Sequence, residues 1–99
     1  MRFVDRIVFV NETDYHVHVD VRTSTGGWLG LTTVSAGETA QVAEVIEQGD
    51  MWTFRFSYGR YQPVQLDFTR NELIDADWRV EVPPELEEKL RDDGVPVPP

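Results

Sequence analysis

The amino-acid sequence predicts an all-β domain: a seven-stranded antiparallel β-sandwich with one short helical turn before the last strand and a short C-terminal helix. The first observation is a period-two alternation of apolar and polar residues, typical of strands with one buried face. The second is the regular recurrence of turn residues between these stretches. The third is size, because 99 residues can build one core but not two.

Four strands are predicted by the alternation alone, at 15–22, 52–58, 64–68 and 78–82. In the first of them, the side chains of Val17, Val19 and Val21 share one face of the strand. His18 and Asp20 lie on the other face. Each of these strands is therefore expected to be half-buried.

Three further strands are predicted at 3–10, 28–34 and 39–46 from apolar runs bounded by turn residues. The first ends in a continuous apolar run, which indicates burial on both faces. In the third, the alternation breaks at Val45 and Ile46, which predicts a β-bulge. The connections between strands are short, as expected for hairpin loops.

Two short helices are predicted near the C-terminus. Thr69 and Glu72 have the spacing of a capping box, in which each side chain binds a free backbone N–H of the other residue. Pro83 and Pro84 precede a second helix over 85–93, and Gly94 follows as its C-cap. We therefore assign residues 1–94 to one domain and 95–99 to an extended, Pro-rich tail.

Composition narrows the classes of partner. The net charge of −9 disfavours nucleic acid and anionic membranes, which carry the same sign. The absence of cysteine excludes disulfides, thiol catalysis and thiolate zinc sites. Asp5 and Arg6 interrupt any N-terminal apolar stretch, so no signal peptide and a cytoplasmic location are expected. No cofactor is expected.

Two groups of side chains are candidates for a site. His16, His18 and Asp20 share one strand face, and a metal site on these three residues is a weak possibility because the chain has no other histidine. Trp52 starts a strand beside Asp50, near the rim of the predicted sandwich. A rim tryptophan can pack against the core and still present an edge to a ligand, although core packing is the commoner role.

Several segments together resemble one known family, the von Hippel–Lindau β-domain. The similarity runs from Ile7 to Leu90 and rests on short stretches: Ile7-Val8-Phe9-Val10-Asn11-Glu12-Thr13, the turn glycine Gly37, Gly49-Asp50-Met51-Trp52-Thr53-Phe54-Arg55, Asn71-Glu72-Leu73 and Val82-Pro83. The resemblance implies a transthyretin-like (prealbumin-like) sandwich, in agreement with the strand count. It also implies a surface that recognises hydroxyproline in an extended peptide.

The four pocket positions of that family carry over unequally. The family's Trp falls at Trp52, its His at Asp50, its Ser near Glu44 and its Tyr near Leu31. Three of the four residue types differ, so the resemblance implies the place of a pocket and not its hydroxyproline chemistry. The family's helical adaptor-binding domain has no counterpart after Pro84, so recruitment of a ubiquitin ligase is not expected.

The leading hypothesis is a non-catalytic domain that binds a protein or peptide around Trp52 and a neighbouring sheet edge. One alternative is a small transthyretin-like hydrolase that uses His16 or His18, although the C-terminal signature of hydroxyisourate hydrolases is missing. A second alternative is a structural domain that dimerises through an edge strand. The sequence leaves monomer and edge-strand dimer open.

Overall fold

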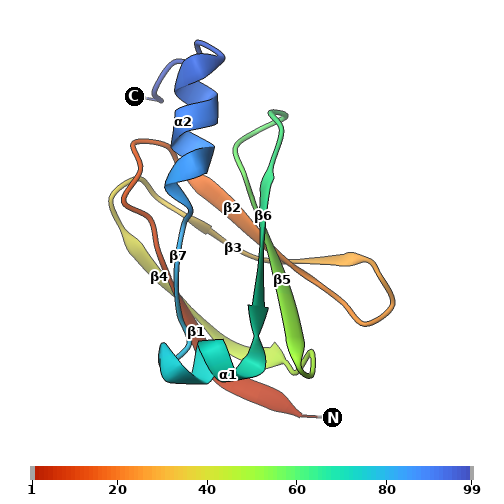
Figure 1. The fold of residues 1–99 in the computed structure, drawn as a ribbon. Coiled ribbons are helices and arrows are strands. Elements are labelled where there is room, and N and C mark those ends of the chain that lie inside the picture. Colours follow the sequence, from red (N-terminus) through yellow and green to blue (C-terminus); the bar gives the residue numbers. More distant parts are fainter. Residues whose placement is uncertain (1, 99) are drawn as a thin grey trace.

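The computed structural model describes residues 2–98, and Met1 and Pro99 lie outside the described residues. It is mostly β, with two sheets and two short helices (Figure 1). One sheet has the order β4-β1-β7, with β1 at Phe3–Val10, β4 at Thr39–Ile46 and β7 at Arg79–Glu81. The other has the order β3-β2-β5-β6, with bounds Trp28–Val34, Val17–Arg22, Met51–Ser57 and Val64–Thr69 respectively. The helices are α1 at Arg70–Asp75 and α2 at Pro84–Asp92.

Both sheets contribute side chains to a single core. The rings of Phe9 on β1 and Phe54 on β5 meet edge to face, with their centroids 5.5 Å apart. The alternation predicted for β2 and β5 is confirmed, because their inward residues are all fully buried: Val17, Val19, Val21, Trp52, Phe54 and Phe56. The helices add Leu73, Leu86 and Leu90 to the same core.

The prediction that all strand pairs are antiparallel is wrong for one pair. Strand β7 runs parallel to β1, with Val8 opposite Arg79 and Val10 opposite Glu81. The reason is that α1 follows β6 at the end of the molecule where β1 begins (Figure 1). The chain therefore enters β7 from the same end as β1, after α1 has carried it from β6 in the other sheet.

We expected all short connections to be hairpins, but within residues 2–98 only the β2–β3 and β5–β6 connections are. The β1–β2, β3–β4 and β4–β5 connections pass from one sheet to the other. Buried Asn11 joins two of these corners, because its side-chain amide donates to the carbonyls of Tyr15 (2.8 Å) and Val34 (3.0 Å). Its carbonyl oxygen accepts from the backbone N–H and the hydroxyl of Thr13. A side chain thus satisfies the backbone groups that a hairpin would have paired.

The bulge predicted at Val45 and Ile46 is absent, because β1 and β4 keep one register from end to end. The alternation breaks there because Glu44 has a left-handed backbone, with φ at 54°. The register shift of the fold occurs instead between β2 and β3, at Val19 and Asp20. Both irregularities interrupt an edge strand, a common way to limit unwanted strand pairing.

The C-terminal segment follows the prediction closely. Thr69 caps α1, and the capping box with Glu72 is confirmed, at 3.1 Å and 2.9 Å. Val95 is only 8% exposed, and its carbonyl accepts a hydrogen bond from the Tyr15 hydroxyl at 2.8 Å. The packed part of the chain therefore continues past the boundary we placed after residue 94.

No helix within residues 2–98 is long and apolar enough to cross a membrane.

Candidate functional site

The structure places Trp52 in the core and not at a rim. Its side chain is fully buried, and the indole N–H donates to the carbonyl of Gly49 at 3.0 Å. The expectation that Trp52 presents an edge to a ligand is therefore wrong. Its ring instead packs edge to face against a second tryptophan, Trp78, with the centroids 5.3 Å apart.

The other three predicted pocket residues are not gathered around Trp52. Leu31 lies on β3 and Glu44 on β4, which are edge strands of different sheets. Asp50 lies in the β4–β5 connection and lines a separate hollow of about 530 Å³ with Arg70. The family pocket transferred by sequence position therefore does not form a single site here.

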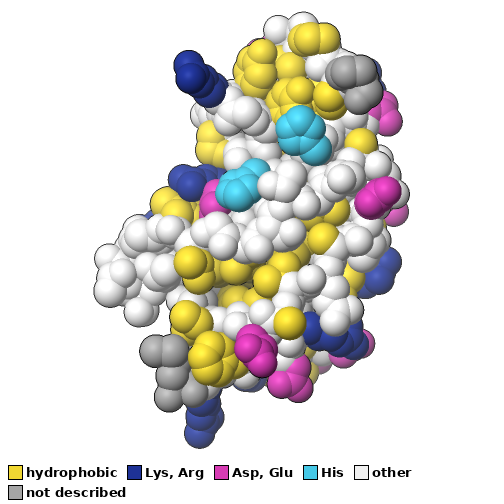
Figure 2. Space-filling model, turned by 180° about the vertical axis from the view of Figure 1, so that it is seen from behind, with side chains coloured by type: hydrophobic (Ala, Val, Ile, Leu, Met, Phe, Trp, Pro, Cys, Tyr) yellow, Lys and Arg dark blue, Asp and Glu magenta, His cyan; other side chains and the backbone are white. Residues whose placement is uncertain are grey.

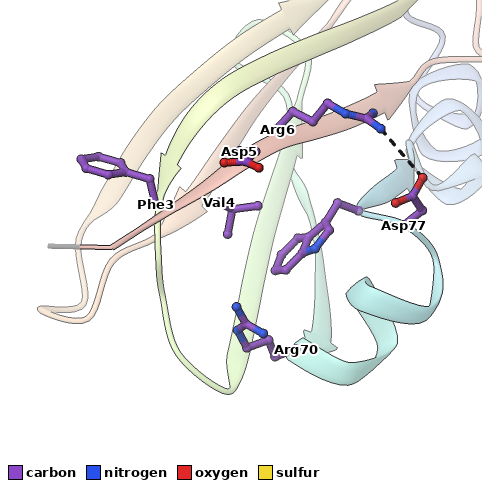
Figure 3. A pocket seen from close by; sticks show the side chains of 7 residues that line it. Phe3, Val4, Asp5, Arg6, Arg70 and Asp77 are labelled. Carbon is purple, nitrogen blue, oxygen red and sulfur yellow. Dashed lines mark ion pairs between the residues drawn. The ribbon is translucent and has the colours of Figure 1, made fainter.

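A groove is present nearby, between the first half of β1 and the α1–β7 connection. We call it the β1 groove; its volume is about 370 Å³, which is in the range of ligand-binding sites. Figure 3 shows Arg6 reaching from β1 toward Asp77, with Arg70 on the opposite side at the start of α1. The groove is lined by Phe3, Val4, Asp5, Arg6, Arg70, Asp77 and Trp78.

One wall of the β1 groove is an unpaired strand edge. Strand β1 pairs with β4 along its whole length, whereas β7 pairs only with Val8–Val10. The first backbone bond on that side runs from the N–H of Val8 to the carbonyl of Trp78, at 2.9 Å. Between Phe3 and Arg6, the edge that faces the groove therefore has no strand partner among residues 2–98. Unpaired edges of this kind are templates for an added strand.

Trp78 owes its position to an unusual turn. Asp77 and Trp78 both have a left-handed backbone, with φ at 55° and 56°. The N–H of Arg79 closes the turn by donating to the carbonyl of Ala76 at 3.1 Å, as in a type I′ turn. A bulky residue in this conformation is a true outlier, and such strain is concentrated at ligand-binding and catalytic sites. The turn leaves Trp78 half-buried in the groove wall, supported from behind by Trp52.

Arg70 is held in place by a two-pronged ion pair. Its Nε and Nη2 atoms donate to the two carboxylate oxygens of Glu47 at 3.1 Å and 2.9 Å. These hydrogen bonds from Arg70 lower the pKa of Glu47, and the same contact raises the pKa of Arg70. The guanidinium also lies 5.6 Å from the centre of the Trp78 ring, within cation–π range. Arg70 is thus a fixed guanidinium beside the groove, with its charge paired to Glu47.

The two histidines lie elsewhere, at the exposed surface seen in Figure 2. His18 Nε2 is 3.0 Å from Asp20, whose carboxylate also binds Arg55, and His18 Nδ1 is 3.1 Å from the Thr33 hydroxyl. His16 packs against Tyr58 instead, at 4.7 Å between ring centroids.

The positions of the two histidines support neither a metal site nor a hydrolase active site. Within residues 2–98, no three histidine, aspartate or glutamate side chains are placed to share a metal ion, so His16, His18 and Asp20 form no metal site. The hydroxyl–imidazole–carboxylate chain of Thr33, His18 and Asp20 has the order of a hydrolase relay. However, Thr33 and Arg55 directly face His18 and Asp20 in the sheet, so these contacts are ordinary cross-strand pairs. Neither histidine lies in the wall of the β1 groove.

Sequence reasoning missed the β1 groove because its residues come from three separate segments. Arg6, Arg70 and Trp78 are brought together by the pairing of β1 with β7, which are about seventy residues apart in the chain. No local signal indicated the groove, because the strand predicted at 78–82 was as long as the one predicted at 64–68, and only the structure shortens it to Arg79–Glu81. Comparison with known proteins adds no guide here: no family model, curated protein or solved structure matches the chain.

Proposed function

We propose that this protein is a non-catalytic β-domain that binds an extended peptide by strand addition in the β1 groove. The observation that carries the proposal is the open half of β1, which borders a groove with a half-buried tryptophan. The added strand would lie along Phe3–Arg6 and extend the line of β7 in the three-stranded sheet. Main-chain hydrogen bonds supply affinity in such complexes, and side-chain pockets supply specificity.

The size of the open edge fits a short segment. Four residues of extended chain span about 13 Å. A preformed edge also lowers the entropic cost of binding, because β4 already holds β1 in the extended conformation. Trp78 provides a flat apolar surface at the point where the peptide would meet the start of β7.

The proposal includes the finer fold assignment, a transthyretin-like sandwich related to the von Hippel–Lindau β-domain. It is supported by a three-stranded and a four-stranded sheet around one core, and by the similar Gly49–Arg55 segment. The binding surface we propose differs from the family's pocket. Trp52 supports Trp78 from behind and does not touch the ligand.

The experiment is selection of a displayed library of random twelve-residue peptides on the immobilised protein. We expect enriched sequences that bind the wild type and lose at least about tenfold in affinity for Trp78→Leu, because aromatic anchors dominate such interfaces. Hydrogen exchange measured by NMR should show new protection of backbone amides within residues 3–6 when an enriched peptide binds.

The matched control is Trp28→Leu, because Trp28 is also half-buried beneath an arginine but lies on the outer side of the other sheet. This variant should bind the enriched peptides like the wild type. The proposal is wrong if no sequence is enriched, or if protection appears at another strand edge while residues 3–6 exchange freely.

A further inference from the structure

We infer that the β1 groove selects a peptide carrying one acidic side chain within two positions of an apolar one. The inference rests on the proposed function and specifies the chemistry of its ligand. Its basis is the distribution of charge and exposure in the groove wall, together with the hydrogen-bond donors that the wall leaves free.

The groove wall carries two arginines, Arg6 and Arg70, and two exposed aspartates, Asp5 and Asp77. Their formal charges balance, so the exposure of each side chain decides what a ligand experiences. The side chains of Arg6 and Arg70 are 47% and 39% exposed, whereas that of Asp77 is 90% exposed. A charge that is fully in water is screened strongly, and a half-buried charge is screened less. A ligand inside the groove therefore experiences Arg6 more strongly than Asp77. The charge of Arg70 is already compensated by Glu47, which is only 18% exposed, so Arg70 contributes mainly its remaining N–H donors.

The two arginines also have hydrogen-bond donors to offer. A guanidinium carries five N–H donors, and Arg70 uses two of its nitrogens for Glu47. Arg6 makes no side-chain hydrogen bond within residues 2–98, because its contact with Asp77 is a loose ion pair at 3.9 Å. A carboxylate from a ligand can replace that loose contact with a direct charge-assisted hydrogen bond.

The apolar requirement comes from Trp78 and Val4, because the ring of Phe3 points away from both of them (Figure 3). Phe3 is 53% exposed at one end of the groove, and Val4 is buried in the groove wall. Successive side chains of an added strand point to opposite faces, and residues two apart share a face. An apolar side chain over Trp78 therefore places an acidic residue one or two positions away within reach of Arg6 or Arg70.

The rest of the surface limits how acidic the ligand can be. The whole chain carries a net charge of −9, so a strongly acidic peptide is repelled before it reaches the groove. The groove should therefore select a single carboxylate in an otherwise neutral segment. This requirement separates it from a general basic patch, which would favour peptides with many acidic residues.

The test uses the peptides enriched from the random library. For each we compare three forms, with the acidic residue kept, changed to its amide, or changed to lysine, and measure dissociation constants with the wild type. We expect the acidic form to bind about tenfold more tightly than the amide form, as one charge-assisted hydrogen bond would give. In Arg6→Glu, the order of the acidic and lysine forms should reverse.

The matched control is Arg60→Glu, which makes the same charge change in the exposed β5–β6 loop, outside the groove wall. It should preserve the order of the three peptide forms. If the enriched peptides are neutral or basic but still protect residues 3–6, the ligand class is wrong and the proposed function stands. If no peptide is enriched, both fail. If light scattering shows a dimer whose interface protects residues 3–6, the occupant is a second copy and the inference is wrong.

Discussion

The two halves of β1 differ in one respect that separates stability from recognition. Residues Val8–Val10 are paired with β4 on one side and β7 on the other, and they supply buried Phe9 to the core. Residues Phe3–Arg6 are paired with β4 alone, and they border the β1 groove. One strand thus anchors the fold with its second half and leaves the edge of its first half unpaired. Because β7 is only three residues long, β1 is paired on both sides at Val8–Val10 and on one side before that point.

The largest expected effect on stability comes from substituting the two phenylalanines of β1, one in each half of the strand. Phe9→Ala should lower the free energy of unfolding by about 3–5 kcal/mol, because it leaves a cavity between the two sheets. Phe3→Ala should change it by less than about 0.5 kcal/mol, because more than half of this side chain is exposed. Urea denaturation followed by tryptophan fluorescence measures both changes. Similar losses in the two variants would mean that the Phe3 side chain is packed as tightly as that of Phe9, which would contradict the comparison.

A smaller effect is expected on the other side of the open half, at Glu44. This residue lies between Ala43 and Val45, the partners of Arg6 and Val4, and has a left-handed backbone. A left-handed conformation costs an ordinary residue about 1–2 kcal/mol, and glycine adopts it freely. Glu44→Gly should therefore raise the free energy of unfolding by about 1 kcal/mol, after the added entropy of the unfolded chain is subtracted.

The control for this substitution is Ala43→Gly, at an exposed neighbour that is not left-handed. Here glycine brings only its entropic cost, so the variant should be less stable by about 0.5–1 kcal/mol. Opposite signs at adjacent positions of one strand would establish the strained backbone of Glu44. Two losses of similar size would contradict it.

The same comparison shows which features the sequence could predict. Features that depend on residues close together in the chain were predicted correctly, such as the buried valines of β2 and the capping box of Thr69 and Glu72. The parallel β1–β7 pair was not predictable in this way, because nothing in 79–81 specifies a partner near residue 8. The site depended on that pair. Trp52 and Trp78 both begin alternating segments, and only the left-handed turn before β7 leaves Trp78 half-buried.

The smallest effect concerns the ion pair that holds Arg70 beside the groove. The pKa of Glu47 is lowered by its hydrogen bonds from Arg70, so Glu47 stays ionised in the folded state at a pH where it is protonated in the unfolded chain. Its contribution to stability is therefore complete above about pH 4.5, the ordinary value, and is lost as the pH falls through the lowered pKa. Glu47→Gln should be slightly less stable than the wild type at pH 7, because partly exposed pairs contribute little.

The pH dependence distinguishes this role from a simple loss of packing. Urea denaturation from pH 7 to pH 2.5 should show the stability difference between wild type and Glu47→Gln shrinking as the pH falls below about 4.5. The control is Glu88→Gln, which makes the same change on the exposed side of α2 and should leave the free energy of unfolding at pH 7 within about 0.5 kcal/mol of the wild type. A difference for Glu47→Gln that is constant with pH would mean that the ion pair does not hold Arg70. The groove would then lack the fixed guanidinium that contributes to the expected preference of the open half of β1 for an acidic residue.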